Sequence, residues 1–110
     1  MIKNKPKSLR ILCPNGHLGF APTKEESFRI GAATRPDFYC CDSGSDDIGP
    51  GPLGGNYCTS PQAWQKHDLE LMLVAARQQS APMLIGSAGD TGVRRGVNMY
   101  IEGSIALFMG

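Results

Sequence analysis

The chain has 110 residues and a formal net charge of +1, because its eleven Lys and Arg side chains nearly balance ten Asp and Glu. This length fits one small domain, and 41% hydrophobic with 19% charged residues is typical of a globular protein rather than a disordered one. The balanced charge argues against a nucleic-acid-binding surface, and no apolar run reaches the roughly 18 residues of a membrane span.

The chain begins with a basic segment. Residues 1–8 contain three lysines and are expected to form a flexible tail, whereas residues 9–110 are expected to form a single α/β domain. The apolar run that follows the tail stops at Pro14, which is too soon for a secretory signal peptide. We therefore expect a cytoplasmic protein.

Four cysteines are present without a C-x-x-C pair, which disfavours a structural zinc site: Cys13, Cys40, Cys41 and Cys58. The first three lie in apolar runs and are expected to be buried, reduced thiols that pack as small hydrophobic side chains. Cys58 lies in a loop and is the best candidate for a reactive thiol.

Three short apolar runs, at residues 9–13, 37–41 and 82–86, each end in glycine-rich sequence. Helical patterns connect them, and no two-residue hairpin turn does, so we expect buried parallel strands. The predicted fold class is α/β, a small parallel sheet with flanking helices built from Rossmann-like βαβ units.

The first connecting helix is predicted over residues 23–33, where Thr23 and Glu26 have the spacing of a capping box. Phe28, Ile30 and Ala32 are expected on its buried side. The pair Arg35-Pro36 ends it, because a residue before proline avoids the helical conformation.

The second connecting helix, over residues 61–79, is the clearest, with Ser60 as a good N-cap and Pro61 as the first helical residue. Trp64 and Leu71 are expected to pack in the core. The position of Asp68 is compatible with the sheet edge and with solvent.

The segment from residue 91 to 110 indicates a weak helix interrupted by glycines, with an apolar end. Such an end is unusual for a domain surface. We expect that it packs on the sheet layer or on another protomer. It also suggests an incomplete or truncated domain, the N-terminal portion of a longer one, or a protomer of a homo-oligomer.

Glycine-rich loops follow all three predicted strands, at residues 14–19, 42–55 and 86–92. Parallel strands bring such loops to one edge of the sheet, where open α/β folds bind ligands. Asp42 is predicted as a general base or metal ligand and His17 as its partner. Ligand contacts are predicted from the rest of the loops: Asn15, Gly16, Ser43, Gly44, Ser45, Gly86, Ser87, Gly89 and Asp90.

The predicted ligand is a small molecule with an anionic group such as a carboxylate, held by Ser87 and nearby backbone N–H groups. No P-loop or nucleophile elbow is present, and the loops leave the cofactor and metal unassigned. The alternative is that aspartates and serines here only cap turns.

Several segments in order resemble the N-terminal part of the acyclic terpene utilisation (AtuA-like) family: ILCPNGHLG at 11–19, ESF at 26–28, RPD at 35–37, DSGSD at 42–46, DLELMLVAAR at 68–77 and IGSAG at 85–89. They fall within residues 10–92, about three quarters of the chain. The resemblance implies a cytoplasmic protein linked to catabolism of acyclic terpenes or related acids, without an assigned reaction. An enzyme, or part of one, and a non-catalytic ligand-binding or subunit-assembly module both remain open.

Overall fold

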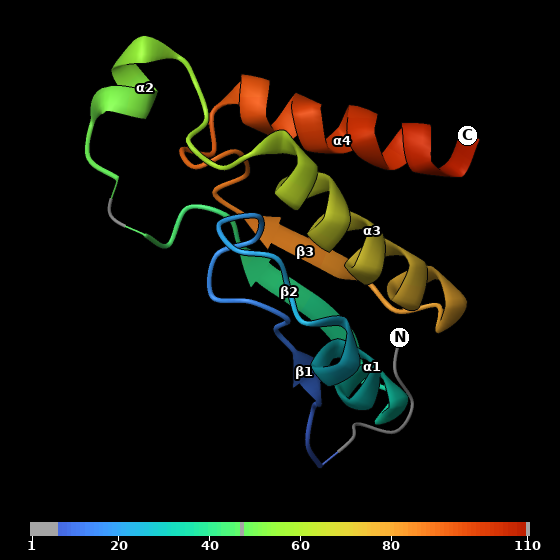
Figure 1. The fold of residues 1–110 in the computed structure, drawn as a ribbon. Coiled ribbons are helices and arrows are strands. Elements are labelled where there is room, and N and C mark those ends of the chain that lie inside the picture. Colours follow the sequence, from blue (N-terminus) through green and yellow to red (C-terminus); the bar gives the residue numbers. More distant parts are fainter. Residues whose placement is uncertain (1–6, 47, 110) are drawn as a thin grey trace.

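The computed structural model describes residues 7–46 and 48–109, so the predicted tail lies almost entirely outside the described residues. Figure 1 shows three strands with helices between and after them. In chain order the elements are β1 (Ile11–Leu12), α1 (Glu25–Ala33), β2 (Phe38–Asp42), α2 (Gly51–Gly55), α3 (Gln62–Gln78), β3 (Met83–Gly86) and α4 (Arg94–Met109).

The three strands form one parallel sheet in the order β1-β2-β3, which confirms the predicted fold class. Leu12 of β1 lies opposite Tyr39 of β2, and Tyr39 lies opposite Met83 of β3. The connections α1 and α3 each return the chain to the next strand in the same direction. The carboxyl ends of all three strands therefore lie at one edge of the sheet.

Helices α1, α3 and α4 lie on one face of this sheet, and α2 lies beyond its carboxyl edge (Figure 1). Phe28 of α1 stacks near Tyr39, α3 contacts β2 and β3, and α4 lies beside α3 (Figure 1). Side chains alternate between the two faces of a strand. Tyr39 and Cys41 accordingly enter the core, whereas Ile11 and Leu84 point away from it and are 51% and 58% exposed.

The core is formed by side chains of β2, of helices α1, α3 and α4, and of the first and third strand-end loops: Leu18, Phe28, Ala32, Tyr39, Cys41, Leu69, Met72, Ala75, Ala76, Ala88 and Tyr100. Helices of this length are marginal alone and derive their stability from such packing. Of the cysteines, Cys41 is buried as predicted, whereas Cys13 is exposed and Cys40 is half-buried.

The predicted capping box of α1 is wrong. The N-cap residue is Lys24, without a side-chain hydrogen bond, and the Thr23 N–H instead donates to the carboxylate of Asp68 at 2.8 Å. Phe28 and Ala32 are buried as predicted, but Ile30 is 67% exposed. Ile30 lies two residues from each, and a two-residue step on a helix changes the face.

The long helix α3 is confirmed, with two corrections at its start. Pro61 is the N-cap, and the Ser60 hydroxyl donates toward Asp90 rather than capping the helix. Trp64 is 40% exposed, so its predicted core position is wrong, and the buried position one residue later belongs to Gln65. Leu71 is half-buried against the core.

The C-terminal segment is a continuous helix, α4, and not the interrupted one that its glycines predicted. A Cβ at Gly96 would overlap the carbonyl oxygen of Ala88, so this glycine allows α4 to pack closely on the loop after β3. Leu107 is half-buried against the core, as expected if the C-terminal end packs on the protein's own sheet layer. Ile105, in contrast, is 53% exposed. The side chains of residues 108 and 109 lie outside the description.

Candidate functional site

The three strand-end loops are hydrogen-bonded to one another. The Leu18 N–H donates to the Asp42 carbonyl at 2.8 Å, which joins the first loop to the second. The Ser43 N–H donates to the Gly86 carbonyl at 2.8 Å and the Asp90 N–H donates to the Ser43 carbonyl at 3.0 Å. The loops at residues 14–19, 42–46 and 86–92 therefore form one continuous edge.

His17 links all three loops through its ring. Its Nε2 lies 3.1 Å from Oδ1 of Asp90, and its Nδ1 lies 3.2 Å from Oδ2 of Asp46. The side chains of His17 and Asp90 are 3% and 0% exposed, whereas that of Asp46 is 47% exposed. A histidine with a buried carboxylate on one nitrogen and an outer carboxylate on the other is an arrangement that can hold or release a proton.

Asp90 is held by several donors. Its Oδ2 accepts hydrogen bonds from the N–H and, at 2.8 Å, from the hydroxyl of Thr59. Burial raises the pKa of Asp90, but the hydrogen bonds from Thr59, Cys58 and His17 outweigh it and bring the pKa below its usual value. The residue also adopts a left-handed backbone, with φ of 76°, which is uncommon outside glycine and is found at functional sites.

The structure places Asp42, the predicted central acid, on the exposed side of the edge. Its Oδ1 accepts the Gly44 N–H at 2.6 Å, the turn-capping arrangement that was the alternative to catalysis. The partners that the structure gives His17 are Asp46 and Asp90 instead. Ser45 is exposed, and its hydroxyl donates to the Gly16 carbonyl.

Ser43 is fully buried, and its hydroxyl forms hydrogen bonds of 3.2 Å to the Leu18 carbonyl and 2.6 Å to the Tyr100 hydroxyl of α4. Burial raises the pKa of Tyr100 to about 12, so its hydroxyl stays protonated. Ser43 therefore connects the strand-end loops to α4 from inside.

Asn15 and Asp68 organise the first loop. The Asn15 amide donates to the Ala21 carbonyl at 2.7 Å. Asp68, only 1% exposed, accepts the N–H groups of Gly19 at 3.1 Å and Thr23 at 2.8 Å. Its position, left open by the sequence, is thus inside the fold, where it ties α3 to the first loop.

The glycines of the edge differ in their surroundings. A Cβ at Gly44 would overlap the Asp90 carbonyl, and one at Gly89 would lie 2.8 Å from Gly96, so these two allow close packing within the protein. Gly16 and Gly86 have open space beside them, as a ligand-facing glycine would. Ser87, the predicted anion contact, is exposed with φ of 50°.

No group of three or more His, Cys, Asp or Glu side chains among residues 7–46 and 48–109 is arranged to hold a metal ion. Both ring nitrogens of His17 already face carboxylates. Asp47, which follows Asp46 in the second loop, lies outside the described residues.

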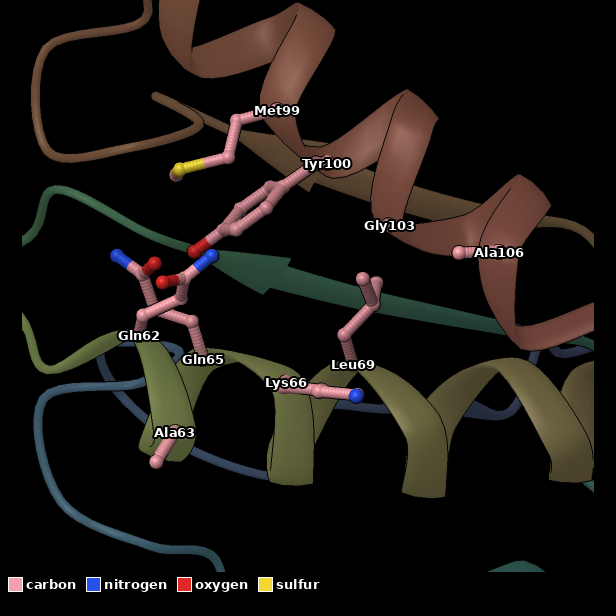
Figure 2. Close-up of a pocket in the computed structure, with 9 residues that line it drawn as sticks. All are labelled: Gln62, Ala63, Gln65, Lys66, Leu69, Met99, Tyr100, Gly103 and Ala106. Atoms are coloured by element: carbon pink, nitrogen blue, oxygen red, sulfur yellow. The ribbon is translucent and has the colours of Figure 1, made fainter. Parts of the chain in front are cut away.

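A cavity of about 500 Å³ lies between α3 and α4 (Figure 2). Tyr100 points its hydroxyl toward the amides of Gln62 and Gln65, and Leu69 faces Gly103. Lys66 also lines this space. The sequence did not single out this cavity, because its lining comes from two helices about 40 residues apart in the chain.

The inner end of the cavity adjoins the strand-end loops. The Tyr100 hydroxyl forms its hydrogen bond to Ser43 there. Gly19 of the first loop packs closely on α3, since a Cβ at this position would lie 3.0 Å from the Gln65 backbone. Gln65 also donates to Cys58 at 2.7 Å, next to the Thr59 that holds Asp90. A ligand in the cavity would thus lie against the layer that supports His17 and Asp90.

Comparison of this chain with protein-family models, with curated proteins and with solved structures finds no match. Among the helices of the described part of the chain, none has the length and apolar character to cross a membrane.

Proposed function

We propose that this chain binds a small molecule with an apolar chain and a carboxylate in the α3–α4 cavity, and that His17 and Asp90 form an acid–base pair in the strand-end loops that adjoin the inner end of this cavity. The observation that carries the proposal is the buried 3.1 Å contact between the two side chains at the carboxyl edge of a parallel sheet. Open α/β folds place their ligands at this edge. The resemblance to the acyclic terpene utilisation family suggests an acyclic terpene acid or a related acid as the ligand.

The contacts around His17 suit both of its protonation states. In the neutral ring, Nε2–H donates to Asp90, and Nδ1 accepts the Asp46 N–H at 3.2 Å. In the protonated ring, Nδ1–H has Oδ2 of Asp46 as its acceptor at the same distance. A general acid–base group needs both states to be accommodated.

The cavity suits an amphiphilic ligand. Its volume of about 500 Å³ is within the usual range for small-molecule sites. Leu69, Met99 and the ring of Tyr100 give it apolar walls, and the Lys66 ammonium supplies a positive charge for a carboxylate. This positive charge contrasts with the outer edge, where Asp42 and Asp46 are exposed carboxylates.

The second candidate is ligand binding without catalysis. It is favoured by the low exposure of His17, 3%, and by the engagement of both ring nitrogens, which also fit a residue that only joins the loops. The two candidates share the cavity and differ in whether a proton reaches the ligand.

The test is titration calorimetry with citronellic acid, an acyclic terpene acid, and with citronellol, the matching alcohol. We expect the acid to bind and the alcohol to bind about tenfold more weakly or worse, since a single partly desolvated charge pair contributes on the order of 1.4 kcal/mol or more. Lys66→Gln should remove this preference. Lys7→Gln, an exposed lysine outside the cavity, should keep it.

Deuterium incorporation separates the two candidates. Incubation of the complex in D₂O with mass spectrometry of the recovered ligand should show carbon-bound deuterium, and His17→Gln should abolish it while binding persists. Binding without deuterium uptake supports the non-catalytic candidate. No binding of the acid at millimolar concentration contradicts the proposal.

A further inference from the structure

Two cysteine thiols in the first two strand segments share one hydrogen-bond acceptor. The Cys13 thiol donates to the backbone carbonyl oxygen of Asn15 at 3.1 Å, and the Cys41 thiol donates to the same oxygen at 2.9 Å. Because both distances end on one atom, the two sulfur atoms are at most about 6 Å apart, and a change of χ1 rotamer in one or both side chains can bring them to bonding distance.

The backbone places the two residues where a disulfide can form. Cys13 directly follows the paired residue Leu12 of β1, and Leu12 lies opposite Tyr39, two residues before Cys41 in β2. One residue further along this register Cys13 is level with Cys40, and Cys41 is its diagonal neighbour. With strands about 4.8 Å apart and a rise of about 3.3 Å per residue, diagonal Cα atoms are roughly 6 Å apart, within the range of about 4.4–6.8 Å usual for disulfide-bonded cysteines.

The two thiols differ in their access to solvent. Cys13 is exposed and lines a cavity of about 390 Å³ together with Pro14, Thr23 and Ser27. Cys41 is only 4% exposed. An oxidant therefore reaches Cys13 first, and Cys41 is the neighbour that can react with the oxidised sulfur.

We propose that Cys13 and Cys41 are a redox-active thiol pair that a hydroperoxide converts into a disulfide, with Cys13 as the sulfur oxidised first and Cys41 as the resolving thiol. This pair does not depend on the proposed acid–base function of His17.

The reaction balances with hydrogen peroxide as the oxidant. The Cys13 sulfur attacks one peroxide oxygen, the O–O bond breaks, and the leaving oxygen takes up the thiol proton to become water. The Cys41 sulfur then attacks the Cys13 sulfenic acid, the S–O bond breaks, and hydroxide leaves as a second water with the Cys41 proton. Two thiols are oxidised to one disulfide, and one peroxide is reduced to two waters.

The second step is expected to be pH-dependent. Burial raises the pKa of the Cys41 thiol to about 12, and the neighbouring Cys13 contributes to this rise. The thiolate is the attacking form, so resolution should become faster as the pH increases. The other ionisable group that acts on Cys41 is the carboxylate of Asp68.

Oxidation would change the first strand-end loop, because a disulfide removes both thiol donors from the Asn15 carbonyl. The side chain of Asn15 contacts Ala21 and Thr23, and its Oδ1 accepts the His17 N–H at 3.4 Å. The pair is thus placed to couple the oxidation state of the protein to the position of this loop.

The experiment uses the full chain with two cysteines replaced, C40S/C58S, so that only Cys13 and Cys41 remain. On treatment with hydrogen peroxide we expect both thiols to become unreactive to Ellman's reagent and the monomer mass to fall by about 2 Da, the two thiol hydrogens. The matched variant C13S/C41S keeps Cys40 and Cys58 and should lose its thiols at least about tenfold more slowly. Addition of dimedone to C40S/C41S/C58S should trap the sulfenic acid on Cys13.

The unmodified chain provides a second measurement that needs no substitution. Trypsin should release residues 11–24 with Cys13 and residues 30–66 with the other three cysteines, since Pro36 protects the bond after Arg35. After oxidation the two peptides should be joined, and fragmentation should place the link at Cys41. A link at Cys40 or Cys58, a Cys13-linked dimer, or a gain of about 32 Da from sulfinic acid would overturn the proposal.

Discussion

Replacement of Asp68 by alanine is the sharpest test of how the first strand-end loop is held. The carboxylate is 1% exposed and accepts hydrogen bonds from the backbone N–H groups of Gly19 and Thr23. Its Oδ1 also lies 2.9 Å from Nδ1 of His67. Alanine would leave two buried N–H groups without their acceptor, at about 1–3 kcal/mol each. For the two groups together we expect a loss of about 2–6 kcal/mol.

That loss is a large part of the stability of a domain this size, about 5–15 kcal/mol at most. Urea unfolding followed by circular dichroism measures it, with Glu70→Ala as the control because Glu70 is an exposed carboxylate on the same helix. The control should change the free energy of unfolding by about 0.5 kcal/mol or less. If Asp68→Ala costs less than about 1 kcal/mol, the hydrogen bonds to the loop are not what stabilises it.

Three further predictions concern the network around the loops. The hydrogen bond from His67 to Asp68 raises the pKa of His67 above its ordinary 6.5, so its stabilisation is present at lower pH and is lost as the pH rises through the folded-state pKa; urea midpoints from about pH 5.5 to 8.5 should fall in the parent protein and less in His67→Gln. Gly44→Ala should cost about 1–3 kcal/mol because its Cβ overlaps the backbone of the third loop, whereas Gly16→Ala, with open space, should leave the thermal midpoint unchanged. Tyr100→Phe removes a 2.6 Å hydrogen bond and should cost about 1 kcal/mol in urea unfolding, and an unchanged midpoint would contradict that contribution.

The sheet could be predicted because its signals are local. Short runs of apolar residues, glycine after each run and helical spacing between them describe parallel strands without any knowledge of side-chain contacts. The long helix α3 could also be predicted from the spacing of its apolar residues. The helix α2 has only five residues, too few to show a helical spacing.

The candidate site was only partly predictable, since the direction of each side chain depends on the register of its strand. Asp42 was chosen as the central acid because it ends a strand. Tyr39 and Cys41 occupy the buried face, so the alternation of β2 places Asp42 on the opposite face. Asp90 meets His17 because the loop after β3 turns back through a left-handed residue, which a hydropathy pattern does not reveal.

The errors on the two helices differ in kind. Ile30 lies two residues from both Phe28 and Ala32, and a two-residue step places it on another face of α1. Trp64 was expected in the core from its three- and four-residue spacing, and it does lie four residues before the buried Asp68, but it belongs to the first turn of α3 and is 40% exposed. Gly96 lies within α4 although a propensity scale counts glycine as a helix breaker, and its missing Cβ leaves room for the Ala88 carbonyl of the third loop. Tertiary packing against the third loop makes that glycine favourable.

The distribution of charge around the loops decides from which side a ligand with a carboxylate can approach. From solvent, the first groups met at the outer edge include the exposed carboxylates of Asp42 and Asp46, which repel an anion. From the α3–α4 cavity, the groups met are the glutamine amides, the Tyr100 hydroxyl and the Lys66 ammonium, which attract one. Since the Tyr100 hydroxyl is hydrogen-bonded to Ser43 inside the second loop, a ligand in the cavity would act on the loops from the side of α4, without breaking the contacts of His17 with Asp46 and Asp90.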